Sequence, residues 1–138
     1  MSFKWKDEYK CDVSNIDEQH QRLFEIGSRI YYMASLKDGI DHYDEIISVM
    51  EELKEYTQYH FDFEEKLLLK NDYPQYEIHK IEHDFFIKKI QRIGKKDLED
   101  QQNEAIMELI SFVADWITSH ILKTDFQYKE FLNQKGIN

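Results

Sequence analysis

The stretch 60–83, HFDFEEKLLLKNDYPQYEIHKIEH, contains two pairs of polar side chains spaced four residues apart, His60 with Glu64 and His79 with His83. In a helix, a spacing of four residues brings both members of a pair to one face. The lone proline, Pro74, interrupts the pattern between the pairs. The stretch therefore predicts two helices joined by a short turn, each presenting a chelating pair.

The same helical pattern extends over most of the chain, and the rare helix breakers divide it. Gly39, Pro74 and Gly94 separate segments whose apolar residues recur at steps of three and four. These segments predict four helices, near residues 17–36, 41–70, 74–93 and 101–121. Short connections favour an all-α, up-down-up-down antiparallel four-helix bundle, with an N-terminal arm and a short C-terminal helix. We expect one domain spanning residues 1–138.

Histidines and acids occupy inward positions of the predicted helices, where a bundle normally has leucine. Because antiparallel neighbours alternate in direction, these side chains should all meet at one end of the bundle. Imidazole and carboxylate donors together suit first-row transition metals, and seven donors exceed the coordination of one ion. The sequence therefore predicts a site for two metal ions, with the candidate ligands His20, His60, Glu64, His79, His83, His120 and Asp125.

Asp125 fits a regular helix poorly, because it follows His120 by five residues. Five residues correspond to about 500° of rotation, which leaves an offset of about 140° from the face of His120. A π-type bulge, or a helix that ends near residues 122–124, would return the carboxylate to that face. We expect one of these irregularities.

A metal-free interpretation treats each of these histidines as a hydrogen-bonded core residue, which is the usual role of a lone buried histidine. Clustering argues against it, because so many buried polar groups without a metal would be costly. Other polar residues receive ordinary assignments. We expect Glu65, Glu82 and Asp84 to be solvated charges, His42 to be a surface histidine, and Cys11 to be a small packed residue.

Composition excludes several classes of function. The net charge of -10 disfavours nucleic acid as a partner, and lysine and arginine form no basic stripe. A single cysteine excludes an internal disulfide framework. The chain contains neither a secretory leader nor an apolar run long enough to cross a membrane, so a cytoplasmic protein is expected.

Over nearly its whole length the sequence resembles the hemerythrin family, and especially its bacterial single-domain members. The matching motifs are the arm with Trp5 and Tyr9, IDEQH at 16–20, HFxxEE at 60–65, YP at 73–74, HxxxH at 79–83 and WxxxHI at 116–121, followed by Asp125 and Tyr128. The chain departs from many relatives at Cys11 and Asp12, where they carry valine and glycine. Aspartate tolerates left-handed backbone better than most residues, so the arm should keep its course.

The resemblance implies a non-haem di-iron centre that binds dioxygen reversibly. Glu64 and Asp125 would bridge the two irons, three histidines would complete one iron, and two would bind the other and leave it an open position. The three are His79, His83 and His120, and the two are His20 and His60. Apolar side chains would line the oxygen pocket and exclude water. They correspond to Leu23, Phe61, Trp116 and Ile121.

The ligand set also bears on the kind of chemistry. Di-iron enzymes in ferritin-like bundles use Glu-x-x-His pairs, and no such pair occurs among these ligands. We therefore predict an oxygen-binding protein for storage, delivery or sensing, and not an enzyme. Peroxide or nitric oxide detoxification at the same site is the enzymatic alternative. An iron-handling or sensor module, acting through an unidentified protein partner, is another, and a monomer is expected.

Overall fold

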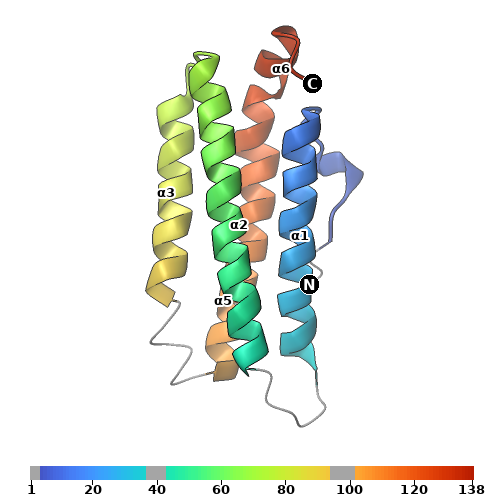
Figure 1. Ribbon diagram of the computed structural model, residues 1–138, viewed down its shortest axis with the longest axis vertical. Helices are drawn as coiled ribbons and strands as arrows, with labels where there is room; N and C mark the ends of the chain where they lie inside the picture. Colours follow the sequence, from blue (N-terminus) through green and yellow to red (C-terminus); the bar gives the residue numbers. More distant parts are fainter. Residues whose placement is uncertain (1–3, 37–42, 94–101) are drawn as a thin grey trace.

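A computed structural model describes residues 4–36, 43–93 and 102–138, and it confirms the predicted all-α bundle. In this part of the chain there is no strand, and the long helices are α1 (Ser14–Ser35), α2 (Tyr43–Lys70), α3 (Tyr76–Ile93) and α5 (Gln102–Ser119). They alternate in direction along the chain (Figure 1). The C-terminal part adds a π-helical turn, η2 (His120–Asp125), and the short helix α6 (Phe126–Gln134).

The four long helices form a closed ring around a common axis. Helix α1 packs against α2 and α5, and α3 packs against the same two neighbours. The start of α1, the end of α2, the start of α3 and the end of α5 therefore lie at one end of the bundle, near the C-terminus (Figure 1). None of the described helices combines the length and apolar composition that crossing a membrane requires.

The turn between α2 and α3 differs from the sequence expectation. Pro74 was predicted within the first turn of a helix, whereas α3 begins at Tyr76. Asp72 adopts a left-handed conformation with φ of 56°, and the amide of Tyr73 donates to the carbonyl of Leu68 at 3.0 Å. This pattern is a Schellman-type helix end, which satisfies the last carbonyls of α2 and reverses the chain before the proline. The expectations for Gly39, His42 and Gly94 fall outside the described residues.

The N-terminal arm contacts α1 at two points. Tyr9, in the short helix η1 (Asp7–Tyr9), stacks on Phe24 of α1 with ring centroids 5.3 Å apart. Further along, the amide of Cys11 donates to Asp17 at 2.6 Å. Asp12 has a φ of 57°, as its tolerance of left-handed backbone had suggested.

Asp12→Val is expected to lower the free energy of unfolding by about 1–2 kcal/mol, because a β-branched residue is strained in left-handed backbone. Urea denaturation of the metal-loaded protein measures this. Asp12→Gly is the matched control, since glycine adopts this conformation without strain and loses only an exposed ion pair to Lys129. A larger loss in the glycine variant would place the effect in the side chain instead of the backbone.

The interior contains two apolar clusters with a polar layer between them. On α1, His20 lies between Ile16 of the smaller cluster and Leu23 of the larger one, and on α2, Glu64 lies between Phe61 of the larger cluster and Leu68 of the smaller one. The larger cluster fills the middle of the bundle, and the smaller one, which includes Tyr128 and Leu132, closes the end. The polar layer is thus shielded from solvent on both sides along the axis.

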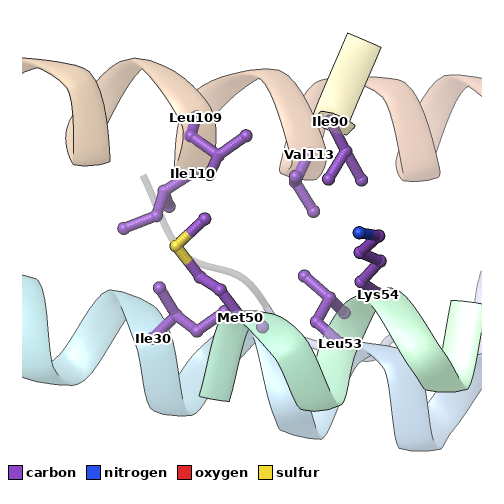
Figure 2. A pocket seen from close by; sticks show the side chains of 9 residues that line it. Ile30, Met50, Leu53, Lys54, Ile90, Leu109, Ile110 and Val113 are labelled. Atoms are coloured by element: carbon purple, nitrogen blue, oxygen red, sulfur yellow. The ribbon is translucent and has the colours of Figure 1, made fainter. Parts of the chain in front are cut away.

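A small cavity of about 20 Å³ lies within the larger cluster, away from the polar layer (Figure 2). Its walls are apolar except for Lys54, and they come from α1, α2, α3 and α5. The other lining residues are Gly27, Ile30, Met50, Leu53, Ile90, Leu109, Ile110 and Val113. Neither histidine nor carboxylate side chains line this cavity, so it is separate from the polar layer.

Candidate metal centre

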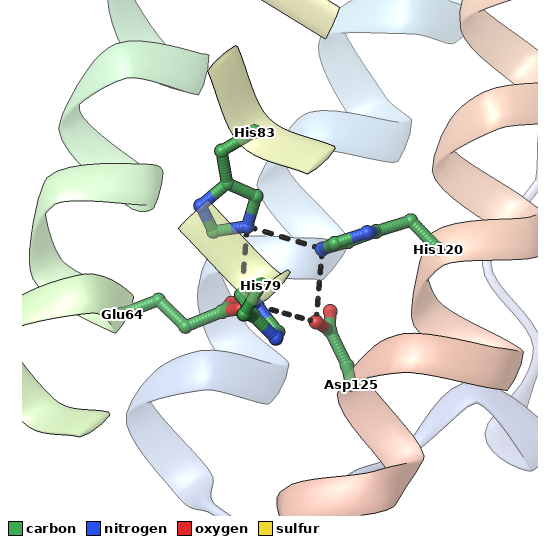
Figure 3. Close-up of side chains that lie close together, drawn as sticks. All are labelled: Glu64, His79, His83, His120 and Asp125. Carbon is green, nitrogen blue, oxygen red and sulfur yellow. Dashed lines mark hydrogen bonds and ion pairs between the residues drawn. The ribbon is translucent and has the colours of Figure 1, made fainter. Parts of the chain in front are cut away.

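The structure brings the seven predicted ligands together at the end of the bundle where α1 begins. Helices α1, α2 and α3 and the η2 turn each contribute at least one ligand, and each of the seven residues is at most 6% exposed. Figure 3 shows five of them converging, Glu64 from α2, His79 and His83 from α3, and His120 and Asp125 from the η2 turn. His20 comes from α1 and His60 from α2.

The donor atoms form two overlapping groups. Those of Glu64, His79, His83, His120 and Asp125 all lie within 4.8 Å of one another, as do those of His20, His60 and Glu64. We call His79, His83 and His120 the three-histidine group, and His20 and His60 the two-histidine group. Glu64 belongs to both sets of donors, so the carboxylate lies at their boundary.

The two oxygens of Glu64 face different groups. Oε1 contacts Nε2 of His79 and lies 3.5 Å from Nε2 of His83. Oε2 lies 3.0 Å from Nε2 of His60 and 3.8 Å from Nε2 of His20. One carboxylate thus reaches both histidine groups, which is the arrangement of a bridging ligand.

Asp125 divides its oxygens in the same way. Oδ1 lies 3.2 Å from His79 and 3.1 Å from His120, and Oδ2 lies 3.1 Å from His20. The wide η2 turn makes this possible, because it changes the rotation between His120 and Asp125 from that of an α-helix. The predicted irregularity is therefore present, and it is of the π type.

Several buried atoms of the site lack a hydrogen-bond partner, which is unusual in a protein core. Among the described side chains, both oxygens of Asp125, Oε2 of Glu64 and Nε2 of His20 have ion-pair contacts but none with hydrogen-bond geometry. They point into the same small volume from different helices. Metal ions would satisfy these atoms, and a set of imidazoles and carboxylates suits divalent first-row metals. The residues present therefore fit a metal centre.

The electrostatics of the metal-free site follow from the buried carboxylates. Burial alone would lower the pKa of His79 and of His120, but the charges of Glu64 and Asp125 outweigh it and raise these pKa values to about 10 and about 9. For His20 the contact with Asp125 likewise overcomes burial and raises the pKa. Without metal, protonated imidazoles therefore neutralise the two carboxylates.

His60 behaves differently, because burial dominates and lowers its pKa. The protonated histidines in turn change the pKa values of the two carboxylates. Burial would raise the pKa of Glu64 and of Asp125, but the neighbouring histidines lower both. Both acids are consequently ionised and available as ligands.

Three polar residues outside the ligand set contact Nδ1 of candidate ligands, the ring nitrogen that faces away from Glu64 and Asp125. Nδ1 of His60 lies 2.7 Å from the amide oxygen of Gln19, and Nδ1 of His83 lies 2.9 Å from a carboxylate oxygen of Glu65. Nδ1 of His120 lies 3.2 Å from Glu82. The hydrogen-bonding contacts of Gln19 and Glu65 fix the orientation of His60 and His83 and leave Nε2 of each ring free for metal, whereas Glu82 makes an ion-pair contact without hydrogen-bond geometry.

These contacts correct the expectation that Glu65 and Glu82 are solvated charges. The side chain of Glu65 is only 13% exposed, and that of Glu82, although 43% exposed, reaches His120. Asp84 does remain on the surface and pairs with Lys80. Sequence reasoning missed Gln19, Glu65 and Glu82, although the need of each ligand histidine for a second partner was a usable signal.

A narrow apolar cavity of about 10 Å³ adjoins the site. Leu23, Phe61, Trp116 and Ile121, the residues predicted to line an oxygen pocket, all line it, together with Ile117, which was not predicted. Two of them also support ligand rings. Phe61 stacks on His83 at 3.7 Å between ring centroids, and Trp116 stacks on His120 at 4.5 Å.

Cys11 is fully buried beside His20, in agreement with the expectation of a packed residue. Burial raises the pKa of its thiol to about 11, so the group is an uncharged thiol at neutral pH. Asp17, the other acid beside His20, accepts the backbone amide of Cys11. This corner of the site thus presents a thiol and an amide-bound carboxylate to His20.

The fold and the site together define a four-helix bundle protein with a buried histidine and carboxylate metal centre. Residues 11–132 match the family model described as the hemerythrin HHE cation binding domain. The chain belongs to the hemerythrin family.

Curated relatives agree with this assignment. A bacteriohemerythrin of Clostridium acetobutylicum is 40% identical over 126 residues, which cover 91% of this chain and 98% of that protein. A bacteriohemerythrin of Stenotrophomonas maltophilia is 31% identical over 135 residues, covering 94% and 84% of the two chains. A hemerythrin-like protein of Naegleria gruberi is 27% identical over 130 residues, or 94% and 93%.

Proposed function

We propose that this protein binds dioxygen reversibly at a pair of non-haem iron ions, for oxygen storage, delivery or sensing. The observation that carries the proposal is the division of both carboxylates, each of which turns one oxygen toward the three-histidine group and the other toward the two-histidine group. Membership of the hemerythrin family supports it. When bound, the irons would supply the electrons that dioxygen takes up and returns.

The proposal assigns a role to every candidate ligand. Glu64 and Asp125 would bridge the irons, the three-histidine group would complete one of them, and the two-histidine group would bind the other. Fewer protein donors face this second ion, so dioxygen would enter on the side of His20 and His60. The cavity is lined by both of these histidines and by Asp125, whereas of the three-histidine group only His120 lines it, which supports this location.

The protein's own contribution is to hold the ligands rigidly and to keep water out. Rings packed against His83 and His120 restrict their movement, and Ile121, only 1% exposed, covers the site from the η2 turn. A dry site limits proton entry and the side reactions that would end reversible binding. A closed site with apolar walls is therefore better suited to a carrier than an open cleft is.

The proposal is tested by anaerobic loading of the metal-free protein with ferrous iron, followed by exposure to oxygen and its removal. We expect two irons per chain and a visible absorption that appears with oxygen and disappears when oxygen is withdrawn. Iron analysis and absorption spectroscopy measure both. Binding of a single iron, or continuous consumption of oxygen with a reductant present, would contradict the carrier function, and the latter would favour the enzymatic alternative.

Trp116→Ala and Ile121→Ala are each expected to keep both irons but to shorten the lifetime of the oxygenated protein several-fold. Neither side chain offers a donor atom of the predicted ligand type, and both line the cavity beside the site, so truncation would admit water. Stopped-flow mixing with oxygen, followed by the decay of the visible absorption, measures the lifetime.

Leu122→Ala is the matched control, because Leu122 neighbours Ile121 in the chain but is 38% exposed. Ile121→Ala also removes buried volume and should cost about 2–5 kcal/mol of stability, so iron content and thermal melting are measured for each variant. Decay at the wild-type rate in both cavity variants, with iron retained, would show that these side chains do not protect the site.

A further inference from the structure

In the two histidine groups, Nδ1 of the rings contacts chemically different side chains. The amide oxygen of Gln19, a neutral group, lies 2.7 Å from Nδ1 of His60 in the two-histidine group. In the three-histidine group, the carboxylate of Glu65 lies 2.9 Å from Nδ1 of His83, and that of Glu82 lies 3.2 Å from Nδ1 of His120. A carboxylate therefore contacts Nδ1 of two of the three rings in the three-histidine group, whereas a neutral amide contacts Nδ1 of His60.

We propose that Glu65 and Gln19 are positioning residues that widen the difference between the two metal positions, so that the three-histidine position binds a divalent ion more tightly and fills first. This inference rests on the proposed function, because it requires two metal ions. It goes beyond that function by assigning part of the difference in affinity, in addition to that from the extra histidine, to residues outside the ligand set.

The physical cause is the charge of the acceptor. A carboxylate that accepts the Nδ1–H of an imidazole withdraws the proton toward itself and makes the opposite nitrogen a stronger donor. An amide oxygen accepts the same hydrogen and orients the ring, but it adds no charge. Both acceptors are largely buried, Gln19 at 7% of the residue and Glu65 at 13% of the side chain, so weak solvent screening preserves the difference.

Neighbouring charges do not cancel this difference. Lys80 approaches Glu65 at 3.4 Å, but its side chain is 47% exposed, so water screens its effect on the site. On the other side, Asp17 accepts the backbone amide of Cys11 instead of a histidine nitrogen, and the thiol of Cys11 is uncharged. The two-histidine group therefore has a neutral hydrogen-bond acceptor at His60, and at His20 a neutral thiol and a carboxylate that is bound to a backbone amide and not to the ring.

Cobalt(II) titration of the metal-free protein against a competing chelator tests the proposal, because it measures affinity without dioxygen chemistry. The wild-type protein is expected to bind two cobalt ions in separate steps. Glu65→Gln, which keeps the shape and removes the charge, should weaken the tighter step about 10-fold and leave the weaker step nearly unchanged. Gln19→Ala should weaken only the second step.

Two further variants make the result specific. Gln19→Glu should strengthen the weaker step and bring the two affinities closer together. Asp84→Asn is the control for loss of a nearby charge, because Asp84 adjoins His83 in the chain but its side chain is 55% exposed and pairs with Lys80. Asp84→Asn should change neither step, and circular dichroism confirms that each variant is folded.

The outcomes separate this inference from the function on which it rests. Failure of the wild-type protein to bind two cobalt ions would contradict the proposed metal pair itself. Two bound ions with affinities that Glu65→Gln leaves unchanged, or that it shifts no more than Asp84→Asn does, would overturn this inference alone. An effect of Glu65→Gln on the weaker step would overturn it as well.

Discussion

Replacing Glu64 with alanine is expected to leave the purified protein unable to hold a pair of iron ions. Among the residues that the structure describes, Glu64 is the one whose carboxylate contacts histidines of α1, α2 and α3, so its loss removes a donor from both groups. The metal-free variant should also lose about 3–5 kcal/mol of stability, because the buried charge of His79 loses a partner. Iron analysis and thermal melting measure the two effects.

Glu77→Ala is the control, since Glu77 is an exposed glutamate near the start of α3, the helix that also provides two of the ligand histidines. It should retain two irons and wild-type stability. Two irons per chain in Glu64→Ala would contradict the bridging assignment. Equal loss of iron in both variants would instead indicate a general effect of removing negative charge.

The second large effect is the release of protons when metal enters the site. At pH 7 the raised pKa values of His20, His79 and His120 keep these imidazoles protonated in the metal-free protein. A metal ion must displace those protons, so about three protons per chain should be released near pH 7, and fewer near pH 10. Calorimetric titration with zinc in buffers of different ionisation enthalpy counts them.

The stability of the metal-free protein should follow the same groups. A histidine whose pKa rises on folding stabilises the fold fully below its unfolded pKa of 6.5, and this contribution is lost as pH rises through about 9 to 10. The Tm of the metal-free protein should therefore fall between pH 7 and pH 10, while metal binding strengthens. A Tm that rises over this interval would show that the imidazoles are neutral at pH 7.

Acid acts on the opposite groups. Glu64 and Asp125 have lowered pKa values in the folded protein, so their stabilising contribution is present above the unfolded pKa and is lost as pH falls through the folded one. Protons also compete with metal for the histidines at low pH. The loaded protein should thus release its metal on acidification.

The fold could be predicted from the sequence because its signals are periodic and local. Apolar residues at steps of three and four mark the inward face of each helix, and alternation of direction places the polar residues at one end. Even the irregular turn at Asp125 was predictable, since a carboxylate five residues from His120 cannot share its face in an α-helix. The start of the third helix was predicted at Pro74 and is at Tyr76 instead, because the left-handed conformation of Asp72 ends α2 and leaves the proline between two helices.

The side chains that contact Nδ1 of the ligand histidines could not be predicted from periodicity. Glu65 lies beside Glu64 on α2, and its contact with His83 exists only because α2 and α3 pack side by side. Gln19 reaches His60 across the α1 and α2 interface for the same reason. Residues on the flanks of a helix face a neighbour or water according to the packing distance and rotation, and sequence periodicity does not specify these.

The η2 turn is equivalent to one extra residue inserted between α5 and α6. A π-helical turn accommodates one residue more than the α-helix it interrupts, so every side chain after it is rotated by about 100° relative to an uninterrupted helix. The turn spans His120–Asp125 and continues into α6, which places Tyr128 and Leu132 in the apolar cluster that closes the bundle. The extra residue of the η2 turn therefore serves both the inward carboxylate of Asp125 and the apolar residues that close the bundle beyond it.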